Sequence, residues 1–179
     1  FKAMGELMTQ NFGYIAEVPF TIVRPSAVYG HTDCNRRVTE IFVVNALQGK
    51  SLRLENEGKT MLDFTHVSDT ARGIILATTE EAGKGQTFNI TAGNSRSLKD
   101  LADILASIVP DVEVELVTCQ DRFRPARGTL DITKARQLLG YEPRFSLEDG
   151  IRDYVQNIVD NDLIPDIKPE IRATLSRRT

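Results

Sequence analysis

The sequence of 179 residues has no tryptophan, only two cysteines and two histidines, and no long run of apolar residues. Cys34 and Cys119 have no cysteine or histidine neighbour at metal-ligand spacing, which predicts free thiols in a reducing compartment and no metal site. No stretch approaches the roughly 20 apolar residues of a membrane-spanning helix. Phe1 opens an amphipathic pattern and not a signal peptide. These absences favour a cytoplasmic protein.

An excess of positive charge is also absent, since the formal net charge is −3. This balance argues against non-specific binding to nucleic acid or to an anionic membrane. The 41% of hydrophobic residues and 26% of charged residues are close to the averages of globular proteins, so the chain can bury a core of useful size.

Complete catalytic motifs are missing as well. Residues 83–85 read G-x-G, but Phe88 occupies the position of the third glycine and a strand pattern follows, whereas a dinucleotide site needs the start of a helix there. The P-loop, H-E-x-x-H and G-x-S-x-G patterns are absent. His31 and His66 have no evident nucleophile partner, and His66 is interpreted as a structural residue. The chain alone therefore contains no complete catalytic constellation.

Apolar periodicity predicts an α/β chain in which helices and strands alternate. The predicted helices cover residues 2–12, 37–47, 68–79, 97–109, 132–139 and 146–159. The predicted strands cover residues 18–25, 51–54, 61–64, 86–91 and 112–117. Gly13 is expected to end the first helix, and a capping box is expected at Ser97 and Asp100. Because only one strand reads as strongly buried, we expect the chain to begin within a fold.

Several short segments, in this order, carry a resemblance to a known family. Residues 24–30 resemble the pattern R-P-x-x-V-Y-G, and residues 58–69 resemble G-x-x-x-R-D-F-x-H-V-x-D. Residues 88–93 resemble the strand end Y-N-I-G-x-G, and residues 127–143 resemble D-x-S-K-A-x-x-x-L-G-x-x-P. Together they resemble the C-terminal half of extended short-chain dehydrogenases/reductases, in the branch of NAD-dependent sugar-nucleotide epimerases and dehydratases.

The resemblance implies a fold and a domain organisation. Residues 1–30 would be the last helix and strand of a Rossmann-type NAD(P)-binding domain. Residues 31–162 would form a small mixed α/β domain that binds the nucleotide sugar, and residues 163–179 would be a surface tail. The full protein would transiently oxidise the sugar with NAD or NADP, which the missing N-terminal half would mainly bind, so the isolated chain is expected to be inactive.

The same resemblance assigns a catalytic role to Lys2. The family pattern Y-x-x-x-K, with a glutamate four residues after the lysine, fits Lys2 and Glu6, and the tyrosine would stand four positions before Lys2. A lysine one helical turn away lowers the pKa of a tyrosine, so that the phenol can act as an acid/base, and it can also bind the nicotinamide ribose. The implied cofactor contacts are Lys2, Pro25 and Val28.

Arginines are the implied ligands of the substrate diphosphate, because a guanidinium binds phosphate oxygens in a forked geometry. Arg127 stands where the family has its basic residue, and Arg124 is the alternative. Residues 35–38 resemble an N-x-R-V stretch that approaches the nucleotide, which adds Asn35, Arg36 and Val38 to the predicted substrate contacts.

Two departures from the family leave the substrate open. Leu62 replaces the arginine of R-D-F, and Ala27 replaces an asparagine before V-Y-G. Two alternatives therefore stay open: a reductase of a non-sugar small molecule, such as a flavonoid or steroid, and a non-catalytic binding or regulatory module. The helix from Lys2 resembles one that pairs with its copy in dimers of the family, so a homodimer is expected.

Overall fold

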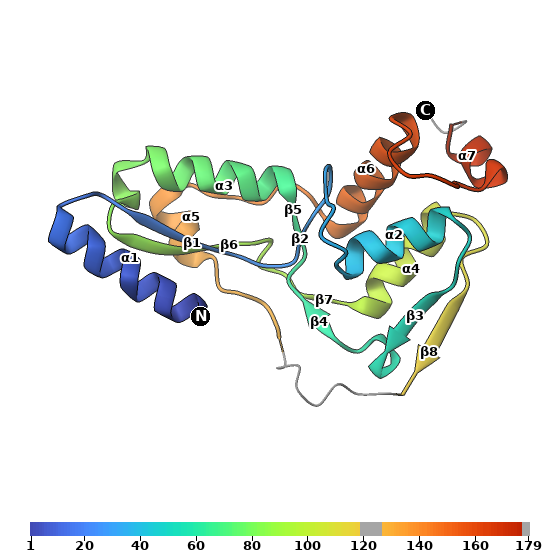
Figure 1. Ribbon diagram of the computed structural model, residues 1–179, viewed down its shortest axis with the longest axis horizontal. Coiled ribbons are helices and arrows are strands. Elements are labelled where there is room, and N and C mark those ends of the chain that lie inside the picture. The colour runs from blue at the N-terminus through green and yellow to red at the C-terminus, as the bar shows by residue number, and fades with distance from the viewer. Residues whose placement is uncertain (119–126, 177–179) are drawn as a thin grey trace.

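The computed structural model describes residues 1–118 and 127–176, and its elements form two groups that lie side by side (Figure 1). The α/β class predicted from the sequence is confirmed. Among the described residues no helix combines the length and the apolar character needed to cross a bilayer.

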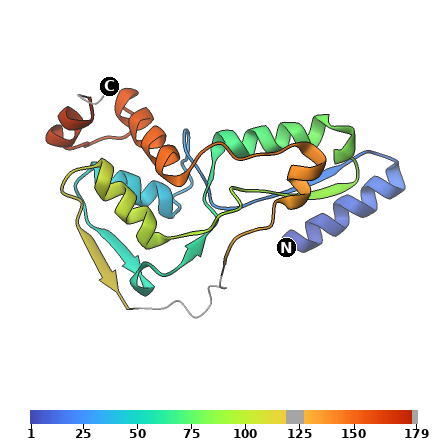
Figure 2. The ribbon, with the colours of Figure 1, turned by 180° about the vertical axis from the view of Figure 1, so that it is seen from behind.

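The first group is built on two parallel strands, β1 (Thr21–Pro25) and β6 (Gln86–Ile90), which pair along their whole length. The helices α1 (Lys2–Ala16) and α3 (Val67–Thr79) lie on opposite sides of this pair, and α5 (Thr133–Leu139) lies next to β6 (Figures 1 and 2). The short 3-10 helix η2 (Glu81–Gly83) precedes β6. The buried side chains of this group, which we call the smaller core, are Ala77, Phe88, Ile90, Ile132, Ala135, Leu139 and Tyr141.

The second group consists mainly of helices around a larger core. Its helices are α2 (Val38–Leu47), α4 (Leu98–Ile108), α6 (Leu147–Asp160) and α7 (Pro169–Ser176). The strands β3 (Leu52–Glu55) and β8 (Val114–Val117) form a parallel pair at its edge, and η1 (Asn56–Gly58) follows β3. Among the fully buried side chains are Tyr29, Leu101, Leu105, Ile151 and Tyr154.

Short strands connect the two groups. Parallel pairing joins β2 (Val28–Tyr29) to β5 (Thr65–His66), and antiparallel pairing joins β4 (Met61–Leu62) to β7 (Arg96–Ser97). β5 continues directly into α3 of the first group, and β7 continues directly into α4 of the second group, so the short strands lie where the chain passes between the two groups.

Side-chain caps fix where two of the large helices begin. The Ser97 hydroxyl accepts the backbone N–H of Asp100, whose carboxylate accepts the N–H of Ser97, which confirms the predicted capping box at the start of α4. Ser146 likewise accepts the N–H of Asp149 at the start of α6. Both caps satisfy backbone donors that the first helical turn leaves without partners.

Two predictions about the ends of the chain are wrong. Gly13 does not end the first helix, which continues to Ala16 and closes at Glu17 with a positive φ of 54°. The segment 163–179 was expected to be a surface tail, but its described part, residues 163–176, contains α7 and buries Ile167, Ile171 and Leu175 in the larger core. These apolar side chains recur at every fourth residue, which places them on one side of the chain against α6.

The predicted strands at 51–54 and 112–117 correspond to β3 and β8, but the burial of β8 differs from the expectation. The sequence predicts a half-buried strand, whereas Val114 and Leu116 are 42% and 56% exposed. β3 alternates buried and exposed residues because it packs on α4, while β8 lies at the outer edge of the pair.

Candidate functional site

The carboxyl ends of β1 and β6 lie at the same edge of the first group, where Pro25 is paired with Ile90. In open parallel sheets, ligands bind outside this edge. Pro25 is exposed, and Val28 follows it on β2 as a half-buried residue paired with Thr65. The N-terminal end of α1 lies at the same edge, because α1 runs antiparallel to β1 (Figures 1 and 2).

Lys2 begins α1 and is exposed, with no side-chain partner among the described residues. One turn further along the helix, the Glu6 carboxylate accepts hydrogen bonds from Nε and Nη2 of Arg24 at 2.7 and 2.5 Å. The hydrogen bonds from Arg24 lower the pKa of Glu6. This forked ion pair fixes the first turns of α1 against the end of β1 and so positions the helix that carries Lys2.

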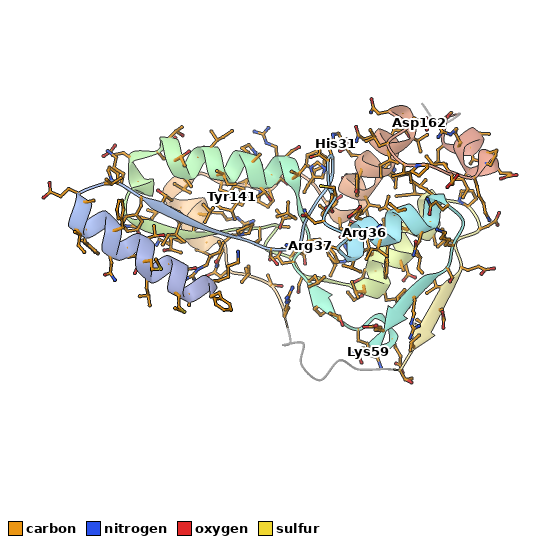
Figure 3. All side chains as sticks on the ribbon, viewed as in Figure 1. His31, Arg36, Arg37, Lys59, Tyr141 and Asp162 are labelled. Atoms are coloured by element: carbon orange, nitrogen blue, oxygen red, sulfur yellow. The ribbon has the colours of Figure 1, made fainter. Side chains whose placement is uncertain are left out.

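The loop before α2 carries the predicted residues Asn35 and Arg36, and Val38 is the first residue of α2. Arg36 has a positive φ of 50° and its backbone N–H donates to the Glu40 carboxylate, which secures the loop to α2. The side chains of Arg36 and Arg37 are exposed, have no ion-pair partner within residues 1–118 and 127–176, and lie between the two groups (Figure 3). Asn35 is exposed, whereas Val38 packs partly against the larger core.

Arg127 is also exposed and has no ion pair to another described residue. Arg124, the alternative diphosphate ligand, and Cys119 lie outside the described residues. Unpaired guanidinium and ammonium groups near one strand edge favour an anionic ligand, because they have no internal carboxylate to neutralise them.

The backbone after Arg127 belongs to no helix or strand but is held by side chains from other elements. Leu130 donates its N–H to Asp63 Oδ2 at 3.0 Å, and the Asn89 amide donates to the carbonyl of Asp131 at 2.8 Å. The N–H of Ser95 donates to the Thr129 hydroxyl at 3.0 Å.

Asp63 was not singled out by the sequence analysis, although it stands beside Leu62 in a matched motif. It is fully buried, and its Oδ2 also accepts a hydrogen bond from the Thr91 hydroxyl at 2.9 Å. Its Oδ1 has no hydrogen-bond partner among the described residues. A charged residue buried this deeply is uncommon unless it is paired, so an acidic residue between the apolar Leu62 and Phe64 is the signal that could have identified it.

A second polar cluster joins α6 to the first group. His66 is buried and stacks on Phe145 with ring centroids 4.0 Å apart. Its Nε2 lies 3.2 Å from Oδ2 of Asp153, and Nε2 of His31 lies 2.8 Å from the same oxygen. Burial lowers the pKa of His66. The packing of His66 on all sides supports its interpretation as a structural residue.

Asp69 plays a comparable structural part at the start of α3. It is buried, and its carboxylate accepts the backbone N–H groups of Arg144 and Phe145 at distances of 2.9 to 3.0 Å. This contact fixes the segment that leads from α5 to α6. The last acidic residue of the matched segment 58–69 therefore secures the connection between the two groups.

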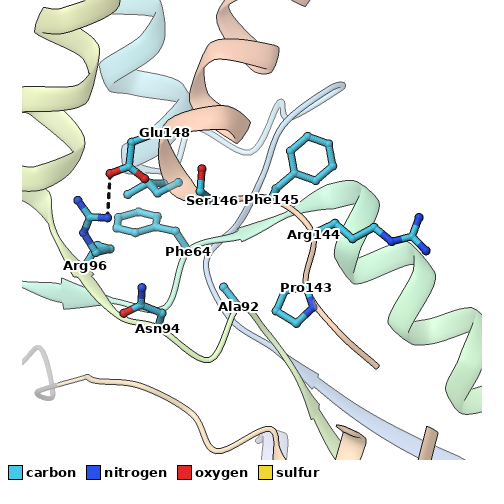
Figure 4. Close-up of a pocket in the computed structure, with 10 residues that line it drawn as sticks. Phe64, Ala92, Asn94, Arg96, Pro143, Arg144, Phe145, Ser146 and Glu148 are labelled. Atoms are coloured by element: carbon cyan, nitrogen blue, oxygen red, sulfur yellow. Dashed lines mark hydrogen bonds and ion pairs between the residues drawn. The ribbon is translucent and has the colours of Figure 1, made fainter. Parts of the chain in front are cut away.

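A pocket of about 180 Å³ lies beside that connection (Figure 4). Phe64, Asn94 and Ser146 line it, and Arg96 Nη1 lies 2.9 Å from Glu148 Oε1 across its edge. None of the predicted cofactor or substrate residues that the structure describes lines this pocket. The predicted residues within 1–118 and 127–176 instead lie on the loops and element ends around the carboxyl edge of β1 and β6.

Parallel strands with helices on both faces place the chain in the class of Rossmann-type α/β proteins. Residues 1–91 match the family described as "NAD dependent epimerase/dehydratase family", and the chain belongs to this family.

Relatives and solved structures give the same family. The chain is 28% identical over 158 residues to "Uncharacterized UDP-glucose epimerase YtcB" of Bacillus subtilis, covering 86% of this chain and 49% of that protein. It is 27% identical to a dTDP-glucose 4,6-dehydratase of Neisseria gonorrhoeae, with 89% and 49% covered. The UDP-glucuronic acid 4-epimerase of Bacillus cereus, solved with UDP-glucuronic acid and NAD, superposes with a TM-score of 0.80 at 25% identity, with 89% and 51% covered. The chain spans about half the length of these proteins.

Proposed function

We propose that the intact protein is an NAD(P)-dependent nucleotide-sugar epimerase or dehydratase that transiently oxidises the sugar of its substrate. Membership of the family supports the class of enzyme. The observation that carries the proposal to this chain is the set of exposed cations, Lys2, Arg36 and Arg127, which have no internal ion-pair partner among the described residues. A nucleotide sugar supplies the diphosphate that such cations bind.

Lys2 is the proposed catalytic residue. Its ammonium group would lower the pKa of a tyrosine one turn upstream and bind the nicotinamide ribose. The exposed side chains of Lys2 and Pro25 at the carboxyl edge fit a ribose, since neither is covered by the chain. When bound, the nicotinamide accepts and returns the hydride, and the residues of this chain orient the sugar and the ribose.

The proposed substrate contacts lie on both sides of the carboxyl edge. Arg36 and Asn35 approach from the loop before α2, and Arg127 approaches from the segment before α5. Val38 supports the loop from the start of α2. Arg124 stays an alternative to Arg127, and either would supply a forked guanidinium in place of the arginine that Leu62 replaces.

The two cores support a revised division into domains. We propose that β6, α3 and α5 belong with α1 and β1 to the dinucleotide-binding side, because Val23 of β1 packs against the smaller core, which these three elements build. The nucleotide-sugar-binding domain would then consist of α2, β3, α4, β8, α6 and α7. The carboxyl edge of β1 and β6 would then lie between these two domains.

We propose that the chain of 179 residues neither binds NAD tightly nor turns over a nucleotide sugar by itself. A dinucleotide pyrophosphate needs a glycine-rich turn at a helix N-terminus, and residues 83–85 lead into β6 instead. A calorimetric titration of NAD into this chain tests the proposal, and micromolar affinity would overturn it.

A homodimer through α1 is proposed on the exposure of its apolar side chains. Met4, Leu7, Met8 and Phe12 are each at least 60% exposed, and α1 buries no residue in either core. Leu7→Glu is expected to convert a dimer of the intact protein into monomers in sedimentation analysis. A monomeric wild-type protein would contradict the proposal.

Leu62 favours a second candidate, a reductase of a non-sugar small molecule. It is an apolar residue, 9% exposed, where the family has an arginine for the diphosphate. The test incubates the intact protein with NAD and UDP- or dTDP-sugars and separates the products by chromatography. Conversion of a sugar nucleotide supports the main proposal. Failure to bind any nucleoside diphosphate favours the reductase or a non-catalytic module.

A further inference from the structure

We propose that residues 129–131 form a strap whose anchoring aims Arg127 at the substrate diphosphate, with Asp63 and Thr129 as positioning residues. The inference rests on the proposed function, because it assumes that Arg127 binds the diphosphate. The strap would hold the backbone next to Arg127 in place before the substrate binds.

The inner side of the strap is anchored on a buried carboxylate. Asp63 Oδ2 accepts the N–H of Leu130 at 3.0 Å and the Thr91 hydroxyl at 2.9 Å. Asp63 and Thr91 are both fully buried. Because losing a hydrogen-bond donor to a buried carboxylate costs free energy, this hydrogen bond holds Leu130 beside Asp63.

The two neighbouring residues of the strap are anchored on other elements. The Thr129 hydroxyl accepts the N–H of Ser95 at 3.0 Å and shares a hydrogen bond of 2.8 Å with the Ser95 hydroxyl. The carbonyl of Asp131 accepts the Asn89 amide from β6 at 2.8 Å. Each residue of the strap is therefore held by a partner at least 34 positions away in the sequence.

These contacts replace the fixation that a helix or strand would provide. Residues 127–132 belong to no regular element, so without the anchors their backbone would sample many conformations. Arg127 stands two residues before the strap and is itself exposed and without an ion pair to the described residues. A fixed backbone lowers the entropy that the arginine loses on binding a phosphate, which is the usual gain from preorganisation.

Thr129→Val tests the strap with little risk to the fold, because Thr129 is exposed and valine has nearly the same shape. The expected result is a dissociation constant for UDP that rises about three- to tenfold in the intact protein, as the loss of one ordered side chain predicts. The matched control is Thr78→Val, which removes an exposed hydroxyl bonded only within α3. It should leave the affinity unchanged.

Variants at Asp63 test the inner anchor. Asp63→Asn keeps an oxygen that can accept the N–H of Leu130, so UDP affinity should stay within about twofold of wild type. Asp63→Ala removes the acceptor and should weaken UDP binding at least as much as Thr129→Val. Thermal unfolding of each variant, measured alongside, identifies any protein that has failed to fold.

A double-mutant cycle separates aiming of Arg127 from a general structural effect. If the strap acts through Arg127, Thr129→Val should weaken UDP binding in wild type and should add nothing to Arg127→Ala. The strap would be overturned if Thr129→Val weakened UDP binding equally in both backgrounds, or if it had no effect in wild type while Arg127→Ala was impaired. Either result would leave the proposed function standing. Unchanged UDP binding in Arg127→Ala would instead remove the diphosphate assignment on which the strap rests.

Discussion

Two helices of nearly equal length show how differently the two groups are built. α6 has 14 residues and buries seven of them, whereas α1 has 15 residues and buries none. α6 forms part of the larger core, whereas Gly13 of α1 lies close to Phe20, which precedes β1, and Glu6 of α1 forms an ion pair with Arg24 of β1. One helix holds the fold together, and the other presents a surface.

This difference predicts that substitutions that affect stability and substitutions that affect activity fall on different helices. Substitutions on α6 should lower the free energy of unfolding, since they remove packed apolar area from water. Substitutions on the outer surface of α1 should change activity or assembly and leave unfolding nearly unchanged. The predictions below test this separation, beginning with the largest effect.

Lys2→Ala should lower the turnover of a nucleotide sugar by the intact protein about 10²–10⁴-fold, because it removes support for general acid–base catalysis. Substrate affinity and the unfolding midpoint should hardly change, since Lys2 is exposed and belongs to neither core. Lys84→Ala, at the opposite end of β6, is the matched control and should retain full turnover. Near-normal turnover of Lys2→Ala at neutral pH would show that Lys2 has no catalytic role.

Ile151→Ala in the larger core and Phe88→Ala in the smaller core should each cost about 2–5 kcal/mol of unfolding free energy. Both side chains are at most 1% exposed, so each truncation loses transfer free energy and leaves a cavity. Denaturant titration followed by circular dichroism measures the cost. Ile15→Ala on α1, a residue 85% exposed, should cost less than about 0.5 kcal/mol. A larger cost for Ile15→Ala than for Ile151→Ala would reverse the comparison.

Glycines test how closely the helices of the two groups pack. A Cβ at Gly150 on α6 would lie 2.0 Å from the hydroxyl oxygen of Tyr29, and one at Gly73 on α3 would lie 2.2 Å from Ile90. Gly150→Ala and Gly73→Ala should therefore each destabilise the fold by about 1–3 kcal/mol through overpacking. On α1, Gly5 has no atom within 4 Å of such a Cβ, and Gly5→Ala should stabilise the helix by up to about 1 kcal/mol. Thermal unfolding of the three variants provides the measurement.

The sequence predicted the order of the elements better than it predicted their burial. Ser97 with Asp100 marks a helix start by local chemistry alone, and the structure confirms it. The burial of Ile171 and Leu175 could not be inferred in the same way, because it depends on α6 lying beside them in space.

Only those residues of the candidate site that stand in a sequence motif could be predicted. Lys2, Pro25, Arg36 and Arg127 stand in matched patterns, whereas the anchoring of the strap depends on contacts between positions distant in sequence. Asp63 binds the N–H of Leu130, 67 residues further along, and no local pattern encodes that pairing. The fold has to be known before such a residue can be recognised.

The junction between the groups should show a modest pH dependence of stability. Burial lowers the pKa of His66, although Asp153 and Asp69 nearby raise it and His31 lowers it further. The unfolded state therefore binds more protons as the pH falls below about 6.5, so stability is present above that pH and is lost as the pH falls toward the lower pKa of the folded state. The slope should stay below about 1.4 kcal/mol per pH unit for this one group. Denaturant titrations between about pH 5 and 8 should show a smaller slope in His66→Gln; an unchanged slope would assign it to other groups.

The most direct test of the account is a calorimetric titration of UDP and dTDP into the intact protein and its Arg127→Ala and Arg127→Lys variants. We expect binding by the wild type, a dissociation constant raised about tenfold or more in Arg127→Ala, and partial recovery in Arg127→Lys, because an ammonium group cannot make a forked contact. Arg144→Ala, which removes an exposed arginine whose side chain has no partner among the described residues, should bind like wild type. Wild-type affinity in Arg127→Ala with a loss in Arg124→Ala would move the contact to the alternative residue. Absence of binding by the wild type would contradict the nucleotide-sugar function itself.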